Sequence, residues 1–188
     1  MLTQEQIDFY HEYGYLGVEN VLSEDEVVEL RLVTDEFVEK SRKVTEHTAE
    51  FDLEPGHTTE SPRLRRLKSP ILLHELYRNL MHHENILAHV SQLIGYGLRS
   101  NGNKLNMKQP GYGSPVEWHQ DWAFYPHTND DLLAVGVVID DMTEENGPLL
   151  VIPGSHKGPI YDHNLDGHFC GAVTDPAFSD ETAVSVMV

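Results

Sequence analysis

The hydrophobic pattern of this chain changes its period near residue 98, and that change is the strongest constraint on the fold. Before it, apolar residues recur at helical spacing, and after it they fall into short runs typical of strands. The pattern therefore predicts a mainly β protein with an α-helical cover (α+β), built as a small antiparallel barrel or sandwich. Extended pieces are expected over residues 98–107, 117–124, 132–141, 149–153 and 184–188.

Two helix starts near the N-terminus are marked by capping boxes. Thr3 with Gln6, and Ser23 with Glu26, each place a hydroxyl and then an amide or carboxylate ahead of apolar positions at helical spacing. Gly14 follows the first of these segments, where a left-handed residue can end a helix. We therefore expect a short helix before Gly14 and a longer one after Ser23.

Further along the first half, the sequence predicts two more helices and one irregular stretch. Ser69 followed by Pro70 is a good N-cap with a proline at the first helical position. Another helix is expected from about Glu84 to the terminating Gly95. Residues 45–61 show no period and are expected to form a loop or a lid.

Composition and charge limit the classes of function. The 188 residues are 39% hydrophobic, which suits one domain with residues 1–97 as helical cover and lid and residues 98–188 as β core. A net charge of −18 would repel a phosphate backbone, so nucleic acid is not an expected partner. The longest apolar run, residues 132–139, is too short to span a bilayer, and the polar start has no signal-peptide form. We therefore expect a cytoplasmic protein without a membrane partner, which the lone Cys170 also suits.

The segment His119-Gln120-Asp121 carries the candidate metal chemistry. In an extended chain the side chains at i and i+2 leave the same face, so an imidazole and a carboxylate would point together while Gln120 points away. These are two of the three ligands of the facial triad that binds non-heme Fe(II) and leaves one side open for oxygen and a co-substrate. A third ligand has to come from elsewhere in the protein.

Three ordered motifs give the chain a resemblance to a known family. They are His-x-Asp at 119–121, Asn-Gly-x-Leu at 146–149 and Pro-Gly-Ser-His-Lys-Gly at 153–158. Together with the aromatic opening before the long capped helix, they resemble the phytanoyl-CoA dioxygenase family over nearly the whole chain. The resemblance implies an Fe(II)- and 2-oxoglutarate-dependent hydroxylase on a double-stranded β-helix, the jelly-roll or cupin-like fold.

The resemblance also implies roles for particular residues. His119 and Asp121 match the first two iron ligands. The family's 2-oxoglutarate contacts fall on Lys104, Gln120 and one of Arg63 or Arg65.

Aromatic and imidazole side chains directly after the metal motif are the candidates for contact with a small-molecule substrate. They are Trp122, Phe124 and His127. Aromatic residues that flank a strand also suit the core, and that role stays open for Trp122 and Phe124.

The end of the sequence departs from the family pattern. In the family, a distal His on a late strand and a following Arg complete the site, whereas here the late strand is expected to begin at Val184 and no cation follows Lys157. Five or six strands can be placed where a double-stranded β-helix needs eight. We therefore expect the N-terminal part of a longer enzyme, inactive by itself. The alternative is a complete chain in which His163 or His168 is the third ligand, although loop histidines are more often solvated.

The implied reaction is the hydroxylation of an unactivated C–H bond of a small organic substrate, with 2-oxoglutarate converted to succinate and CO2. Fe(II) and 2-oxoglutarate are the implied cofactor and co-substrate. A non-catalytic relative of the same fold, which binds a small molecule or regulates a partner, is the alternative. A zinc hydrolase fits less well, since neither its third ligand nor its general base can be placed.

Overall fold

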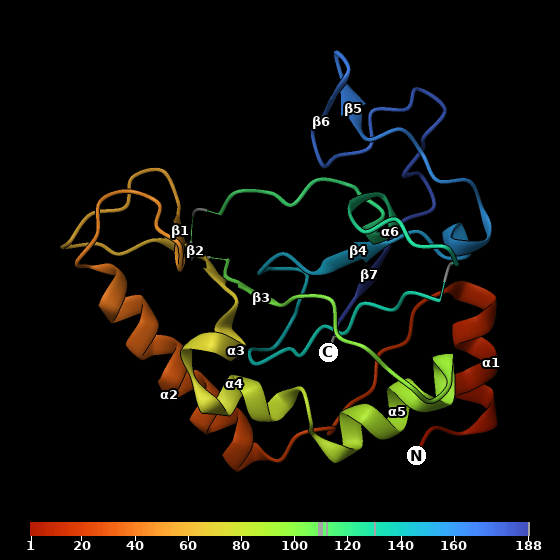
Figure 1. Ribbon diagram of the computed structural model, residues 1–188, viewed down its shortest axis with the longest axis horizontal. Helices are drawn as coiled ribbons and strands as arrows, with labels where there is room; N and C mark the ends of the chain where they lie inside the picture. Colours follow the sequence, from red (N-terminus) through yellow and green to blue (C-terminus); the bar gives the residue numbers. More distant parts are fainter. Residues whose placement is uncertain (109–110, 112, 130, 188) are drawn as a thin grey trace. The chain divides into compact units, whose positions relative to one another are not determined.

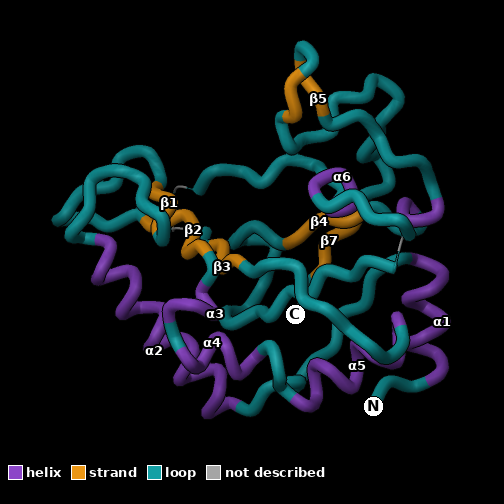
Figure 2. Tube along the Cα trace, viewed as in Figure 1, coloured by secondary structure: helices purple, strands orange, loops and turns teal. Residues whose placement is uncertain are grey.

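The computed structural model describes residues 1–108, 111, 113–129 and 131–187, and its contacts divide the chain into two compact units. The first unit comprises residues 1–18, 90–96 and 115–188, and the second comprises residues 19–89 and 97–114. Figure 1 labels the helices and strands of both units, and Figure 2 colours them by type. No helix in the described stretches is long and apolar enough to cross a membrane. The assignment of residues 1–188 to a single domain stays a prediction.

Helix α1 (Gln4–Tyr13) begins and ends where the sequence predicted. The Thr3 hydroxyl accepts a hydrogen bond from the Gln6 N–H at 3.2 Å, and the Gln6 side chain accepts one from the Thr3 N–H at 2.9 Å. Gly14 ends the helix in the left-handed conformation at φ 81°. The capping box and the glycine stop are therefore both confirmed.

Helix α2 (Glu24–Ser41) is the longest helix and confirms the second capping box. Ser23 and Glu26 exchange hydrogen bonds at 2.8 and 3.3 Å. The helix buries Leu30 and Phe37, which lie on the apolar face that the sequence pattern indicated.

The helix expected after Ser69 is interrupted. It forms as α3 (Pro70–Leu73) and α4 (Glu75–Leu80), separated by an extended His74. The His74 ring accepts a hydrogen bond from the Leu76 N–H at 3.2 Å and so caps α4. Ser69 lies in the left-handed region at φ 49° and makes no side-chain capping bond, so its predicted role as N-cap is wrong. Helix α5 (Glu84–Ile94) ends before Gly95 as predicted.

The second unit contains an antiparallel sheet in the order β1-β2-β3. Its strands are β1 (Phe51–Leu53), β2 (Leu64–Lys68) and β3 (Lys104–Asn106). Leu64 and Leu67 on β2 are fully buried, while Lys68 pairs with Asp52 of β1 at 3.0 Å. Strand β1 falls in the stretch that was predicted to be a loop, so that prediction is wrong there. Its short Phe-Asp-Leu alternation becomes a strand because β2 supplies the backbone partners.

The strands of the first unit are short and form two separate pairs. Strand β4 (Leu149–Val151) pairs with β7 (Val184–Val186), and β5 (Asn164–Leu165) pairs with β6 (His168–Phe169). Strands β4 and β7 lie within the predicted pieces 149–153 and 184–188, and Val188 lies outside the described residues. The expected strand over residues 132–141 is not formed. Its described residues lack the paired backbone neighbour that a strand requires.

The Pro-Gly-Ser-His-Lys-Gly turn contacts the C-terminal end of α1 within the first unit. The Gly154 N–H donates to the Tyr13 carbonyl at 2.8 Å, and the His156 Nε2 lies 3.2 Å from the His11 carbonyl. A Cβ on Gly14 would lie 2.2 Å from the His156 Nδ1, so glycine is required there by contact as well as by φ. Two stretches that carry the family resemblance thus meet at this junction.

Candidate metal centre

The structure brings His119 and Asp121 together at the start of the short helix α6 (Asp121–Phe124). The His119 Nε2 lies 3.5 Å from the Asp121 Oδ1, and the two side chains are 27% and 37% exposed. Gln120 between them is extended, at φ −118° and ψ 123°, so the same-face geometry expected for i and i+2 is obtained. The strand predicted over 117–124 is not formed: Trp118 lies in a bend, and from Asp121 the backbone closes a helical turn with the Tyr125 N–H bonded to the Asp121 carbonyl.

A hydrogen bond to the backbone fixes the tautomer of His119. Its Nδ1 lies 2.8 Å from the Glu117 carbonyl oxygen, which can only accept, so Nδ1 carries the hydrogen. The other ring nitrogen, Nε2, faces the Asp121 carboxylate. An imidazole nitrogen and a carboxylate oxygen that face one another are the donor types that suit non-heme iron.

Among the described residues, no group of three His, Cys, Asp or Glu side chains is arranged to hold a metal ion. His119 and Asp121 match two of the three ligand types that the triad requires, and their role as iron ligands stays a prediction.

His163 does not take the third position in this structure. Its Nε2 accepts a hydrogen bond from the Gln120 N–H at 3.0 Å, and its Nδ1–H donates to the Tyr161 carbonyl at 2.8 Å. The expectation that it is a solvated loop residue is wrong, because only 2% of its surface is exposed. His168 is exposed on strand β6.

The Gln120 side chain is bonded to the same neighbouring segment. Its Nε2 donates to the Pro159 carbonyl at 3.0 Å, and its Oε1 accepts from the Tyr161 N–H at 2.8 Å. Both ends of the amide are thus engaged by the backbone. The contact of Gln120 with 2-oxoglutarate stays a prediction.

The aromatic ring of Phe124 packs against His119. The Phe124 ring meets the His119 imidazole edge-on at a centroid distance of 5.6 Å and meets Phe169 edge-on at 4.9 Å. The Trp122 indole N–H donates to the Asn129 carbonyl at 3.2 Å, and His127 is exposed. The substrate roles of Trp122, Phe124 and His127 stay predictions.

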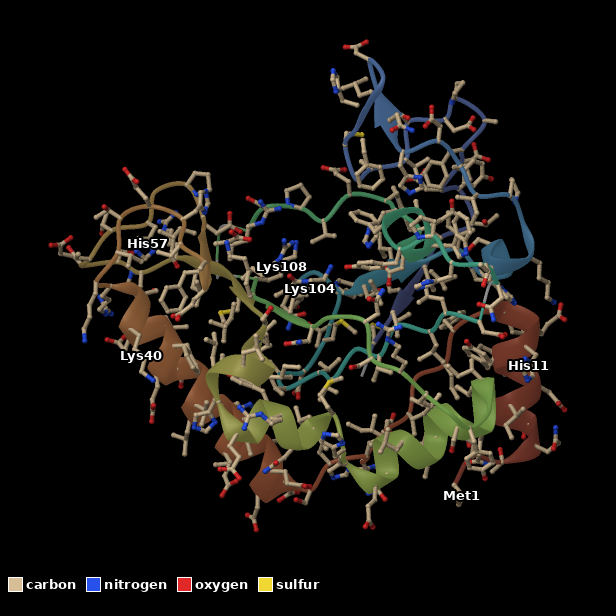
Figure 3. All side chains as sticks on the ribbon, in the orientation of Figure 1. Met1, His11, Lys40, His57, Lys104 and Lys108 are labelled. Carbon is tan, nitrogen blue, oxygen red and sulfur yellow. The ribbon has the colours of Figure 1, made fainter. Side chains whose placement is uncertain are left out.

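The basic residues predicted for 2-oxoglutarate belong to the second unit. Lys104 is exposed at the start of β3, and Figure 3 labels it together with Lys108. Arg63 precedes β2, where its N–H donates to the His57 ring at 2.8 Å and its carbonyl accepts from the Glu54 N–H at 2.8 Å. Their contact with 2-oxoglutarate stays a prediction.

Glu54, which follows β1, is a buried polar residue that the sequence did not single out. Its carboxylate, in a residue only 2% exposed, accepts hydrogen bonds from the Ser114 hydroxyl and from the Ser114 N–H, the latter at 2.8 Å. Burial opposes ionisation, but the Ser114 hydrogen bonds and the charges of Arg65 and Lys108 outweigh it, so the pKa of Glu54 lies below its usual value. Ser114 lies 60 positions away in sequence, and no local pattern indicates this pairing.

Two solved structures show which proteins share the fold of this chain. The epimerase SnoN, in a complex with Fe3+, alpha-ketoglutarate and nogalamycin RO, has a TM-score of 0.69 at 22% identity and covers 98% of this chain and 70% of its own. EctD from S. alaskensis with bound Fe has a TM-score of 0.67 at 22% identity, over 82% of this chain and 54% of its own. The chain thus has the fold of iron- and 2-oxoglutarate-binding proteins, consistent with a cupin-like fold.

Sequence comparison places the chain within that class. The model of the phytanoyl-CoA dioxygenase (PhyH) family matches residues 10–186, and the chain belongs to this family. A probable alpha-ketoglutarate-dependent hypophosphite dioxygenase of Stutzerimonas stutzeri is 38% identical over 178 residues, which cover 93% of this chain and 61% of the relative. The L-proline trans-4-hydroxylase of Streptomyces griseoviridis is 32% identical over 81% of this chain and 55% of its own length. The chain therefore spans somewhat more than half the length of these two relatives.

Proposed function

We propose that the full-length protein is an Fe(II)- and 2-oxoglutarate-dependent dioxygenase that hydroxylates an unactivated C–H bond of a small organic substrate. The observation that carries the proposal is the 3.5 Å approach of the His119 Nε2 to the Asp121 Oδ1 in a chain of the phytanoyl-CoA dioxygenase family. Iron and 2-oxoglutarate, when bound, supply the oxidising chemistry that converts 2-oxoglutarate to succinate and CO2.

The residues of this chain bind the metal and 2-oxoglutarate and orient the metal ligands. The Glu117 carbonyl holds the His119 Nδ1–H, which leaves Nε2 for the metal, and Asp121 adds a carboxylate oxygen. The Phe124 ring packs edge-on against the His119 imidazole and helps to orient it. We also propose that Lys104 pairs with a carboxylate of 2-oxoglutarate, and that either Arg63 or Arg65 does so too.

The third ligand and the final strands of a double-stranded β-helix are proposed to come from outside residues 1–188. Two observations support this: the described residues hold no three-ligand group, and both nitrogens of His163 are bonded to backbone groups. Residues 1–188 alone are therefore expected to release no succinate. Sustained turnover by this stretch would contradict the proposal.

Hypophosphite is a second candidate substrate, with a P–H bond in place of the C–H bond. The observation that favours it is the 38% identity to a probable hypophosphite dioxygenase over 93% of this chain. A panel of hypophosphite, L-proline and ectoine, each supplied with Fe(II), 2-oxoglutarate and oxygen, separates the two candidates. Phosphite or a hydroxylated organic product is the deciding readout.

The ligand assignment is tested by alanine substitution in the full-length protein. His119→Ala and Asp121→Ala should each abolish Fe(II)-dependent release of succinate, with a loss larger than the roughly 10–100-fold effect of removing a supporting partner. His11→Ala, which removes an exposed histidine of the same unit, is the matched control and should retain activity.

Metal titration separates this enzyme from a non-catalytic binding relative. A dioxygenase should bind 2-oxoglutarate together with Fe(II), and His119→Ala should weaken both. Binding of 2-oxoglutarate without metal, and unchanged by His119→Ala, would favour the binding relative and contradict the dioxygenase.

A further inference from the structure

The backbone N–H and both polar atoms of the Gln120 side chain are hydrogen-bonded to one short segment, residues 159–163. Its N–H donates to the His163 Nε2 at 3.0 Å, its side-chain nitrogen donates to the Pro159 carbonyl at 3.0 Å, and its side-chain oxygen accepts from the Tyr161 N–H at 2.8 Å. We call Pro159, Tyr161 and His163 the Gln120 bracket. It grips the one residue that lies between the two proposed metal ligands.

Within the bracket, the His163 ring is held by hydrogen bonds at both nitrogens and by contacts with two aromatic rings. Its Nδ1–H donates to the Tyr161 carbonyl at 2.8 Å, so the neutral ring can only accept at Nε2. The imidazole stacks on Phe169 with an interplanar angle of 15°, and the Phe124 ring meets it edge-on. The His163 carbonyl also accepts from the Cys170 N–H at 2.9 Å, which joins it to the β5–β6 hairpin. A buried polar ring bonded in this way has one orientation.

We propose that His163 is a positioning residue for the metal ligands. Its Nε2 fixes the Gln120 peptide, whose φ of −118° and ψ of 123° set the directions in which His119 and Asp121 project. The His119 Nε2 and the Asp121 Oδ1 are thereby held 3.5 Å apart. The inference rests on the proposed function for the identity of the metal, whereas the bracket itself is formed by the chain's own residues.

The experiment compares three variants of the full-length protein. His163→Phe keeps an aromatic ring in the stack but removes the acceptor, His163→Gln restores an acceptor oxygen, and His11→Phe is the matched control at an exposed position of α1. The first readout, without metal, is hydrogen exchange of the Gln120 amide by NMR. It should be faster in His163→Phe, slower again in His163→Gln, and unchanged in His11→Phe.

The second readout is the dissociation constant for Co(II), used as a spectroscopic stand-in for Fe(II). His163→Phe should bind Co(II) about 10–100-fold more weakly, with partial rescue in His163→Gln, since this is the usual cost of losing a partner that orients a ligand. A purely structural role would lower the unfolding midpoint and leave the Co(II) affinity of the folded protein unchanged. That result would overturn the inference.

The outcomes separate this inference from the proposed function. A wild-type protein that does not bind Co(II) contradicts the proposed metal site. A wild-type protein that binds Co(II) while His163→Phe binds it equally well overturns the role of His163. If His163→Phe does not fold, the 15N shifts of the wild-type ring decide: a protonated Nδ1 and an accepting Nε2 support the bracket, and the opposite tautomer overturns it.

Discussion

Two buried polar side chains, one in each unit, perform the same task with different charge. His163 in the first unit and Glu54 in the second are each 2% exposed, and each accepts a backbone N–H, from Gln120 at 3.0 Å and from Ser114 at 2.8 Å. His163 accepts as a neutral imidazole, whereas Glu54 accepts as a carboxylate that also takes the Ser114 hydroxyl hydrogen. We call each of these two buried acceptors an anchor. Because both are equally buried, burial alone does not determine how much stability an anchor contributes. Removing the charged anchor should lower the free energy of unfolding more, and its contribution should decrease in acid.

The largest effect is expected from Glu54→Ala, which tests how much the charged anchor contributes to the free energy of unfolding. The substitution leaves the N–H and hydroxyl of Ser114 without their acceptor, so the free energy of unfolding should fall by about 2–3 kcal/mol. Urea unfolding measures it. Glu36→Ala is the matched control, because it removes an exposed carboxylate of α2 in the same unit, and an exposed ion pair such as that with Lys40 contributes under about 1 kcal/mol. Equal losses in the two variants would remove the distinction between a buried anchor and a surface pair.

Acid should weaken the Glu54 anchor in a way that Glu54→Gln removes. The folded pKa of Glu54 lies below its usual value, so its contribution is fully present above the unfolded pKa and is lost as the pH falls through the folded pKa. The wild-type midpoint in urea should therefore drop more steeply with acid below the usual Glu range than the midpoint of Glu54→Gln. Parallel pH profiles would show that folding does not lower the pKa of Glu54.

A smaller effect is expected for Ser114→Ala, which separates the two hydrogen bonds that Glu54 accepts. The hydroxyl donor is lost, but the backbone N–H still donates at 2.8 Å, so the free energy of unfolding should fall by about 1 kcal/mol. Ser61→Ala, on an exposed turn of the same unit, is the control and should change little. A loss as large as that of Glu54→Ala would mean that the hydrogen bond from the Ser114 hydroxyl accounts for the whole stabilising effect of Glu54.

Local signals in the sequence predicted the parts of the fold that local interactions determine. The capping residues of α1 and α2 and the glycine that ends α1 were read correctly because each acts within a few residues of itself. The convergence of His119 and Asp121 was also local, since it follows from the i and i+2 relation. One local signal was missed. Asp166 and Gly167, with φ of 50° and 80°, are the Asp-Gly pair typical of a tight hairpin turn and join β5 to β6.

The non-local parts of the site gave no such signal. Gln120 and His163 lie 43 positions apart, and their pairing depends on how the segment after Pro159 folds against the ligand segment. Strand β1 was likewise missed because three residues carry too little pattern to stand out from a loop, and its partner β2 lies beyond a turn. The roles of both buried anchors therefore had to come from the structure.

The smallest effect is expected for the exposed ion pair between Lys157 and Glu12. Their charged atoms lie 2.9 Å apart, and the hydrogen bond from Lys157 lowers the pKa of Glu12. Both side chains are at least half exposed, so water and salt screen the pair and Lys157→Ala should leave the unfolding midpoint unchanged at physiological ionic strength. A double-mutant cycle with Glu12→Ala should give no measurable coupling. Strong coupling would mean that the ion pair, rather than the hydrogen bond between the Gly154 N–H and the Tyr13 carbonyl, holds this turn on α1. Exposed ion pairs would then contribute to stability as the buried anchors do.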